Sequence, residues 1–465
     1  MTQQEQVWLR ARANALAAEL GPDLPQRIVQ RLYRQAEAVS ARVVRQTPTG
    51  RADWDRRLDD VLTSPRTGYL VMLLVLGLVF WVTVVGANYP SSLLAASLFW
   101  GEEQLTALFA WLGAPAWLHG FVILGVYRGL AWVVSVMLPP MAIFFPLFML
   151  LEDFGYLPRV AFNLDHFFKK AGAHGKQGLT MSMGFGCNAA GVVACRIIES
   201  PRERLIATLT NTFVPCNGRF PTLIVLATIF MGGVVAGTHS SAVAAATVVG
   251  MVLVGIAATL LVSWALSKTL LRGVPSSFTL ELPPYRAPRV GRVLVRSLLD
   301  RTLFVLRRAV VVAAPAGGVT WVLANVQVGS QSALAHLVGW LQPFGHAIGL
   351  DGFIVLAFLL GLAANEIVLP ILFMSYLSAG ALVEMDSLEA IRRLLVDDYG
   401  WTWLTALCMM LFSVLHFPCG TTLWTVYRET RSVRWTLIAG LLPFGIATAV
   451  CFLVAQSVRA LGGLG

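Results

Sequence analysis

The sequence predicts an all-α membrane protein that crosses the bilayer several times. Hydrophobic residues make up 57% of the 465 residues and charged residues only 13%, and the mean hydropathy is +0.70. Soluble globular proteins rarely show this balance. Apolar runs long enough to cross a bilayer, about 20 residues, recur along the chain. Helices are the expected form of these runs, because backbone groups in lipid must be hydrogen-bonded within the segment.

Eight apolar runs are the candidates for membrane helices, and polar stretches divide the chain into four parts. The runs cover residues 69 to 87, 117 to 151, 205 to 230, 241 to 267, 309 to 326, 352 to 380, 401 to 419 and 435 to 456. A polar arm, a first membrane unit, a basic loop and a second membrane unit cover residues 1 to 66, 67 to 267, 268 to 308 and 309 to 465. Arginines interleaved with aliphatic residues predict that the arm is helical, either on the membrane surface or against a partner.

The distribution of basic residues predicts which loops face the cytoplasm. Loops 88 to 118, 231 to 240 and 325 to 351 contain no Lys or Arg, whereas residues 268 to 308 contain nine. Under the positive-inside rule, the first three loops lie outside, and the basic loop and the N-terminal arm lie inside. Membrane topology thus explains the formal charge of +10, and no nucleic-acid partner is expected. The prediction is a multi-pass protein of the cytoplasmic (inner) membrane.

Two segments contain residues that interrupt a membrane helix. The first, "TMSMGFGCNAAGVVACR" at 180 to 196, combines glycines with Cys187 and Asn188, and basic residues flank it on both sides. The second, at 352 to 380, contains Glu366 and has ends that resemble external loops. Irregular backbone is tolerated in a bilayer only where protein or a water-filled cavity satisfies it. We therefore expect broken or re-entrant helices, the first of which enters and returns to the cytoplasmic side.

Each interrupted segment is followed by a spanning helix with a Pro-Cys pair. The two sequences are "FVPCNGRFPTL" at 213 to 223 and "HFPCGTTLWTV" at 416 to 426. The charge bias directs the first helix outward and the second inward. Two related units of opposite orientation form an inverted repeat, which in secondary transporters places the binding site near the membrane midplane, between broken helices.

Cysteines beside helix-breaking residues are candidates for soft metal ligands. Cys187 follows a glycine, and Cys216 and Cys419 each follow a proline. A proline frees the carbonyl one turn back, so the adjacent thiol can act as a ligand beside that oxygen; simple packing is the alternative role. A carboxylate inside a membrane segment is costly enough to indicate a function. Glu366 is therefore a ligand or proton carrier, or one half of a buried pair.

The full set of candidates combines thiols, amides and carboxylates. The main candidates for metal binding are Cys187, Asn188, Cys216, Glu366 and Cys419, and further candidates are Glu152, Asp153, Asn217, Asn365 and His416. The acids at 152 and 153 predict either a cation vestibule or a partnership with Arg159, and the histidine is either a ligand or an ordinary interfacial residue. Such mixed donors suit a borderline transition metal, whereas Mg²⁺ and Ca²⁺ prefer oxygen alone.

Five runs of the chain carry a resemblance to a known family. They are "LLEDFGYLPRVAFNLDHFFKKAGAHGK", "MGFGCNAAGVVACRIIESPRERL", "VPCNGRFP", "LELPPYRAPRVGRVL" and "FPCGTTLWTVYRETRSVRWT". From about residue 55 to the end, they resemble successive motifs of the membrane part of the prokaryotic ferrous iron transporter family FeoB, with its two Gate (nucleoside-recognition-type) units. The resemblance implies Fe²⁺ as the transported substrate, with Cys187, Cys216, Cys419 and Glu366 on the pathway, and homo-oligomers as the assembly.

The chain also departs from the family pattern. Family members usually begin with a cytoplasmic G domain, whereas residues 1 to 60 resemble only the connecting helical part, and no G-x-x-x-x-G-K-[ST] motif is present. We therefore expect no nucleotide bound by this chain, and a separate GTP-binding protein or a small Feo-type accessory protein as partner. The family pattern has a proline soon after the Cys-Asn pair, where this chain has Ala189-Ala190-Gly191. Asn365 replaces a lysine, and the residues after both Pro-Cys pairs differ. An altered substrate is compatible with these changes.

Fe²⁺ transport is the leading functional hypothesis. The alternatives are transport of another divalent metal or of a nucleoside-like solute, and a membrane metal sensor or scaffold that does not transport. An enzyme is not expected, because the chain contains no local motif such as G-x-S-x-G or H-E-x-x-H.

Overall fold

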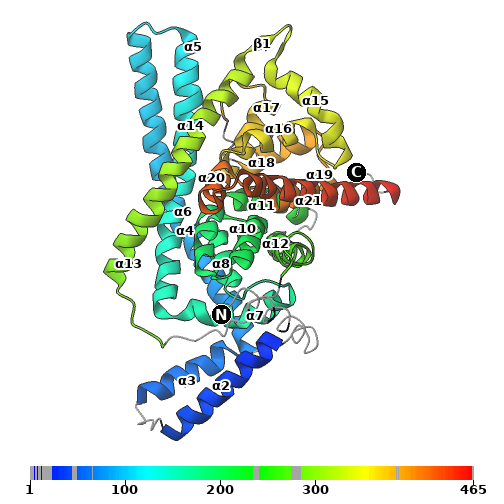
Figure 1. Cartoon of the computed structure of the whole chain (residues 1–465). Helices are drawn as coiled ribbons and strands as arrows, with labels where there is room; N and C mark the ends of the chain where they lie inside the picture. Colours follow the sequence, from blue (N-terminus) through cyan, green and yellow to red (C-terminus); the bar gives the residue numbers. More distant parts are fainter. Residues whose placement is uncertain are drawn as a thin grey trace.

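The computed structural model (Figure 1) describes residues 24–43, 50–64, 66–233, 240–273, 284–383, 385 and 387–462, with three isolated positions nearer the N-terminus. Over these residues the chain is helical apart from its connections and one small antiparallel sheet of β1 (Gln327–Val328) and β2 (Gln331–Ser332). Within the described residues, seven helical segments are long and apolar enough to cross a membrane. The predicted all-α, multi-pass fold is confirmed.

Helices carry the labels of Figure 1, and η marks turns of 3₁₀- or π-helix. The first half contains α2 (Leu24–Val43), α3 (Gly50–Leu62), α4 (Thr67–Trp111), α5 (Ala116–His119), η1 (Gly120–Tyr127), α6 (Arg128–Phe154), α7 (Tyr156–Lys170), α8 (Gln177–Gly186), α9 (Asn188–Ala194), η2 (Cys195–Ile197), α10 (Pro201–Thr210), η3 (Asn211–Phe213), η4 (Asn217–Arg219), α11 (Phe220–Leu226), η5 (Ala227–Gly232) and α12 (Ser240–Lys268). The second half contains α13 (Val290–Arg296), η6 (Ser297–Thr302), α14 (Leu303–Asn325), α15 (Ala333–Ala347), α16 (Gly352–Leu360), η7 (Asn365–Ile367), α17 (Val368–Tyr376), α18 (Leu388–Arg392), η8 (Arg393–Asp398), α19 (Trp403–Leu415), α20 (Gly420–Thr430) and α21 (Val433–Ala460).

Helix α4 is much longer than the predicted span at 69 to 87. Its 45 residues extend over about 68 Å at 1.5 Å per residue, more than twice the roughly 30 Å hydrocarbon core. The expected loop at 88 to 118 is therefore wrong, because helix continues to Trp111 and includes Pro90. The extension packs along η1 and α6, where Nε of Arg128 donates to Glu102 at 3.0 Å. Figure 1 shows this pair of helices rising beside the rest of the domain.

The segment predicted as a basic loop at 268 to 308 also contains helix. From Val290 onward, α13, η6 and α14 follow one another without a break to Asn325. Valine, leucine and arginine alternate there at helical spacing, which places arginines on one side of the helix and aliphatic residues on the other. Residues 274 to 283 of the predicted loop lie outside the described residues.

Both interrupted segments are re-entrant hairpins. In the first, formed by α8 and α9, Nζ of Lys176 at the start donates to the carbonyl of Ile197 at the end, at 3.2 Å. In the second, formed by α16 and α17, the hydroxyl of Tyr376 at the end donates to the carboxylate of Asp351 at the start. Each chain segment therefore returns to the side from which it entered. We call the side of the first hairpin's ends the basic face.

The two Pro-Cys spans run in opposite directions. The first begins with α10 and ends with η5; the second begins with α19 and ends with α20. Pro201, at the start of the first, and Thr430, at the end of the second, line the same small cavity of about 240 Å³. At the opposite face, the ring of Phe230 lies 6.0 Å from that of Trp401, which precedes α19. The predicted inverted repeat is confirmed.

Helix α3 of the arm is attached to the membrane unit through Asp59. Its carboxylate accepts hydrogen bonds from Nε of Arg159 (2.9 Å) and from the hydroxyl of Tyr285 (2.6 Å). Burial raises the pKa of Asp59, but the hydrogen bonds from Arg159 and Tyr285 outweigh burial, and the pKa lies below its ordinary value. The carboxylate is therefore ionised at neutral pH and holds the arm against the domain.

Candidate metal site at four helix breaks

Four interruptions of the helices meet near the middle of the membrane domain. Each main helix of the two hairpins has between 7 and 10 residues, which is about 10–15 Å at 1.5 Å per residue. This is about half or less of the roughly 30 Å core of a bilayer. The hairpin tips, at Cys187 and Ala364, therefore lie near the midplane. The Pro-Cys pairs that end in Cys216 and Cys419 complete the set.

The two hairpin tips share one backbone conformation. Cys187 has φ −154° and ψ 124°, and Ala364 has φ −152° and ψ 126°. Each is followed by an asparagine, so "GFGCNA" corresponds position by position to "GLAANE". In this correspondence Glu366 of the second tip replaces Ala189 of the first. The repeat thus carries a thiol at one tip and a carboxylate at the other.

Asn211 fills the gap at the first tip. Its amide lies against Gly184 and Gly191, where an added Cβ would be 2.7 and 2.5 Å from its side-chain atoms. Its Nδ2 donates to the carbonyl of Asn188 at 3.0 Å. The amide nitrogen of Asn188 is assigned toward the carbonyls of Gly184 (3.2 Å) and Val214 (3.1 Å), because its oxygen would otherwise face only acceptors. The nitrogen of Asn188 therefore holds the break together.

The second tip contacts the first Pro-Cys pair. Nδ2 of Asn365 lies 3.9 Å from Sγ of Cys216, and its buried Oδ1 has no hydrogen-bond partner within the part of the chain that the structure describes. The carboxylate of Glu366 rests on Gly218, where an added Cβ would lie 2.2 Å from Oε1. Glycine is required there by this close approach. The second repeat thus delivers an amide and a carboxylate to the cysteine of the first.

All three predicted cysteines approach this region. Cys187 interacts electrostatically with Cys216 and Cys419, and Glu366 interacts with the latter two. Cys187 and Cys216 are buried, and Sγ of the half-buried Cys419 lies 3.3 Å from the hydroxyl of Thr422. All six cysteines of the chain are free thiols. The structure therefore gathers thiols from both repeats at their junction.

Arg219 is a buried cation that joins the two repeats. Its side chain is only 1% exposed. Nη1 donates to the carbonyls of Thr212 (3.0 Å) and Val414 (2.8 Å), and Nη2 donates to those of His416 and Phe417 (both 3.4 Å). The last three carbonyls directly precede the second Pro-Cys pair. One guanidinium thus fixes the backbone where both spans are broken.

The charge of Arg219 also acts on the candidate ligands. It interacts electrostatically with Cys216, Cys419 and Glu366. A fixed positive charge beside these groups weakens binding of a divalent cation. The sequence analysis missed this residue, although Arg219 is the one charged residue in the apolar run 205 to 230. The reasoning that selected Glu366, the cost of a charge in a membrane segment, would have found it.

The candidate ligands surround a region and do not form a ready-made coordination sphere. Among the described residues, no three His, Cys, Asp or Glu side chains converge closely enough to hold one metal ion. The available donors are the three thiols, the carboxylate of Glu366 and the unpartnered Oδ1 of Asn365. Such a distributed set suits a pathway, because a conducted ion must leave as readily as it enters.

Two further candidates lie at the Pro-Cys pairs. His416 is buried in an aromatic cage, with ring distances of 4.8 Å to Phe358 and 4.9 Å to Phe417. Its Nδ1 donates to two carbonyls of α19 at 2.9 and 3.0 Å, while Nε2 has no hydrogen-bond partner among the described residues. The histidine therefore terminates α19 in this conformation. Asn217 is half-buried and begins η4 directly after the first Pro-Cys pair.

Glu152 and Asp153 lie at the end of α6, on the wall of a separate cavity. Asp153 accepts a hydrogen bond from the backbone N–H of Arg289 at 3.3 Å, and Arg159 binds Asp59. Five arginines line this cavity together with the two acids. The predicted cation vestibule does not fit, because the positive charges outnumber the negative ones.

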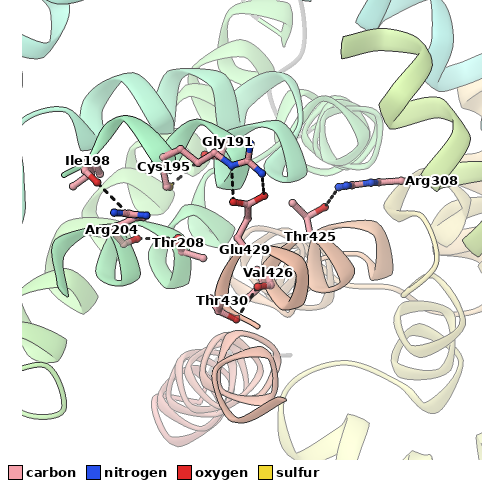
Figure 2. Close-up of polar contacts among 11 residues, drawn as sticks. Gly191, Cys195, Ile198, Arg204, Thr208, Arg308, Thr425, Val426, Glu429 and Thr430 are labelled. Atoms are coloured by element: carbon pink, nitrogen blue, oxygen red, sulfur yellow. Dashed lines mark hydrogen bonds and ion pairs between the residues drawn. The ribbon is translucent and has the colours of Figure 1, made fainter. Parts of the chain in front are cut away.

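Two polar contacts lie at the basic face, one between the repeats and one within the second repeat (Figure 2). Nε and Nη2 of Arg196, in η2, each donate to the carboxylate of Glu429 on α20 at 2.7 Å. This hydrogen-bonded pairing raises the pKa of Arg196. One turn earlier on α20, Thr425 accepts a hydrogen bond of 2.8 Å from Arg308 of α14. Figure 2 shows Glu429 and Thr425 on α20, with Thr425 reaching toward Arg308 of α14.

The repeated architecture and its motifs match two described families. The family "Nucleoside recognition" (Gate) matches twice, at residues 134–231 and 306–433, which are the two repeats. The family "Ferrous iron transport protein B C terminus" matches residues 248–300. The chain belongs to the FeoB family. No solved structure matches it.

Several FeoB proteins are similar over most of this chain. The Fe(2+) transporter FeoB of Staphylococcus aureus (strain MSSA476) is 27% identical over 412 residues, 86% of this chain and 58% of that protein. The Fe(2+) transporter FeoB of Methanocaldococcus jannaschii is 26% identical over 452 residues, 94% of this chain and 63% of that protein. In Porphyromonas gingivalis, a Fe(2+) transport protein A/Fe(2+) transporter FeoB fusion protein is 26% identical over 86% of this chain and 51% of that protein. The chain thus spans between half and two thirds of the FeoB relatives named here.

Proposed function

We propose that the chain is the membrane permease part of a ferrous iron transporter, located in the cytoplasmic (inner) membrane with its basic face inside. The observation that supports this most is the convergence of Cys187, Cys216, Cys419 and Glu366 where the two repeats meet. Thiol and carboxylate donors together suit a borderline ion such as Fe²⁺. The FeoB relatives, which are named Fe(2+) transporters, support the same cargo.

The ligands come from both repeats, so relative movement of the repeats changes the pathway. An entering Fe²⁺ ion exchanges part of its water shell for thiol and carboxylate groups at the helix breaks. The pair Arg196–Glu429 closes the basic face. On the opposite face, the ring of Trp401 in the second repeat packs on that of Phe230 in the first, 6.0 Å away. Rocking of one repeat against the other would open these closures in turn, which is alternating access.

Iron uptake by the purified chain tests the proposal. The assay measures anaerobic ⁵⁵Fe²⁺ uptake into liposomes that contain the wild type, Cys187→Ser or Glu366→Gln. Cys451→Ser is the matched control, since its thiol donates to the carbonyl of Cys408, away from the site. We expect uptake by the wild type and the control, and at least a tenfold loss in the other two. Equal uptake by all four proteins would contradict the assigned pathway.

The closure of the basic face has its own test. Arg196 is 66% exposed, so the ion pair stabilises the closed state by less than about 1 kcal/mol. Arg196→Glu or Glu429→Arg should therefore raise downhill leak of Fe²⁺ by no more than about fivefold. The double reversal should restore the wild-type leak. Identical leak in all variants would remove this pair from the gate.

Other cargo and partners give distinct outcomes in the same assay. Stronger competition by Mn²⁺ or Zn²⁺ than by unlabelled Fe²⁺ would indicate another divalent metal, in line with the departures near the site such as Ala189 and Asn365. Metal binding without flux would indicate a sensor or scaffold. We further propose that a separate GTP-binding protein or a Feo-type accessory protein cooperates with the chain. The fusion protein of Porphyromonas gingivalis supports the accessory protein. Addition of such a partner should then raise uptake.

A further inference from the structure

A cavity of about 1180 Å³ opens beside the first repeat and extends along α9 as far as Ala189, two residues after Cys187. Its floor is the side of α9 from Ala189 to Ala194, together with Ile197 of η2. One wall is the C-terminal turn of α6 with its two acids, and the other walls are residues 284–289, α13 and the start of α14. The cavity is large enough for a small organic ligand or a lipid headgroup.

Arginines dominate the chemistry of this cavity. Its lining contains Arg286, Arg289, Arg292, Arg296 and Arg308. The residues at 289, 292 and 296 follow the spacing i, i+3, i+7, which places their side chains on one side of a helix. Five arginines and two acids are among the lining residues, and Asp153 also accepts a hydrogen bond from the backbone N–H of Arg289. Basic residues therefore outnumber acidic ones in the lining of the cavity.

The other side of α13 is apolar and exposed. Val290, Leu294, Val295 and Leu298 are each at least 39% exposed. An amphipathic helix with aliphatic residues on one side and arginines on the other lies at a membrane interface. This arrangement places the arginines at the depth of lipid phosphates, and basic pockets between membrane helices are known to hold such headgroups.

We propose that this arginine-lined cavity binds a phosphate group, carried by an anionic lipid or by a soluble phosphate ester. The planar guanidinium presents paired N–H donors that match phosphate oxygens, so neighbouring arginines can hold one phosphate by several charge-assisted bonds. A divalent cation is repelled by the same charges. This inference goes beyond iron transport, because binding of a phosphate group in this cavity does not require iron.

Binding measurements without iron test this site on the full purified chain. In the lipid arm, native mass spectrometry compares retention of phosphatidylglycerol with that of phosphatidylcholine. In the soluble arm, inorganic phosphate and pyrophosphate are titrated against chloride of equal ionic strength, and thermal stabilisation is recorded. The variant Arg289→Gln/Arg292→Gln removes two cavity charges. The matched control, Arg392→Gln/Arg393→Gln, removes two exposed charges from α18 and η8, which pair only loosely with Glu389.

We expect binding in one of the two arms. Its affinity should be at least tenfold lower in the cavity variant than in the wild type, a loss of about 1.4 kcal/mol, and should be unchanged in the control. Binding of phosphatidylglycerol alone identifies a lipid site, and binding of the soluble anions alone identifies a soluble ligand. Absence of binding in both arms would overturn the proposal. Equal loss in the cavity variant and the control would also overturn it, since it would show a general charge effect. Because no iron is present, these results are independent of the uptake assay.

Discussion

Replacement of Arg219 with glutamine should loosen the junction between the two repeats. The guanidinium makes two short hydrogen bonds, to the carbonyls of Thr212 (3.0 Å) and Val414 (2.8 Å), and two longer ones of 3.4 Å. A hydrogen bond to a charged group contributes about 1.5–3 kcal/mol, and glutamine can replace one of the short bonds. The free energy of unfolding should therefore fall by about 1.5–3 kcal/mol.

The measurement is reversible unfolding of the chain in mixed micelles, with wild type, Arg219→Gln and Arg219→Lys compared. Lysine keeps the charge but loses the fork that reaches both repeats, so its stability should lie between the other two. Arg393→Gln is the control, because that side chain is 71% exposed. If Arg219→Gln unfolded within about 0.5 kcal/mol of the wild type, as surface substitutions do, the inference that Arg219 joins the repeats would be refuted.

Two further predictions follow from close contacts and from burial. Gly218→Ala places a methyl group 2.2 Å from the original position of Oε1 of Glu366, so the carboxylate must move. ⁵⁵Fe²⁺ uptake should then fall at least tenfold while the chain still folds. Unchanged uptake would show that this carboxylate is not on the pathway. Burial lowers the pKa of His174, although Glu203 partly opposes the shift. As pH falls, the histidine of the unfolded chain is therefore protonated before that of the folded chain. The free energy of unfolding should decrease as pH falls below about 6.5. Thermal unfolding of His174→Gln should show a flatter pH dependence in that range, and an unchanged profile would count against this assignment.

The breaks in the helices could be predicted from the sequence because their causes are local. Glycines around Cys187 and prolines before Cys216 and Cys419 remove helical hydrogen bonds or favour other backbone conformations. Charge bias then predicted that the two units are inverted, and the opposite directions of the two Pro-Cys spans confirm it. That the three thiols and Glu366 belong to one pathway was also predicted from their context, and it stays a prediction for the uptake assay to test.

Features that depend on tertiary packing were not predictable in this way. Helix α4 continues to Trp111 because η1 and α6 pack along it, which hydropathy alone does not reveal. The acids at the end of α6 were predicted to attract cations, but arginines more than 130 residues later in the chain surround them. Arg219 was missed for a different reason, since the rule for buried charge was applied to the carboxylate and not to the guanidinium.

The central feature of the proposed function is an iron pathway that contains thiols from both repeats. X-ray absorption at the iron edge tests it directly on the chain loaded anaerobically with Fe²⁺. We predict a sulfur neighbour at about 2.3 Å, a typical distance for metal-bound thiolate, in the wild type and in Cys451→Ser. The sulfur contribution should decrease in Cys187→Ser and equally in Cys419→Ser. A shell of oxygen and nitrogen alone in the wild type, or a sulfur signal that neither substitution changes, would contradict the account.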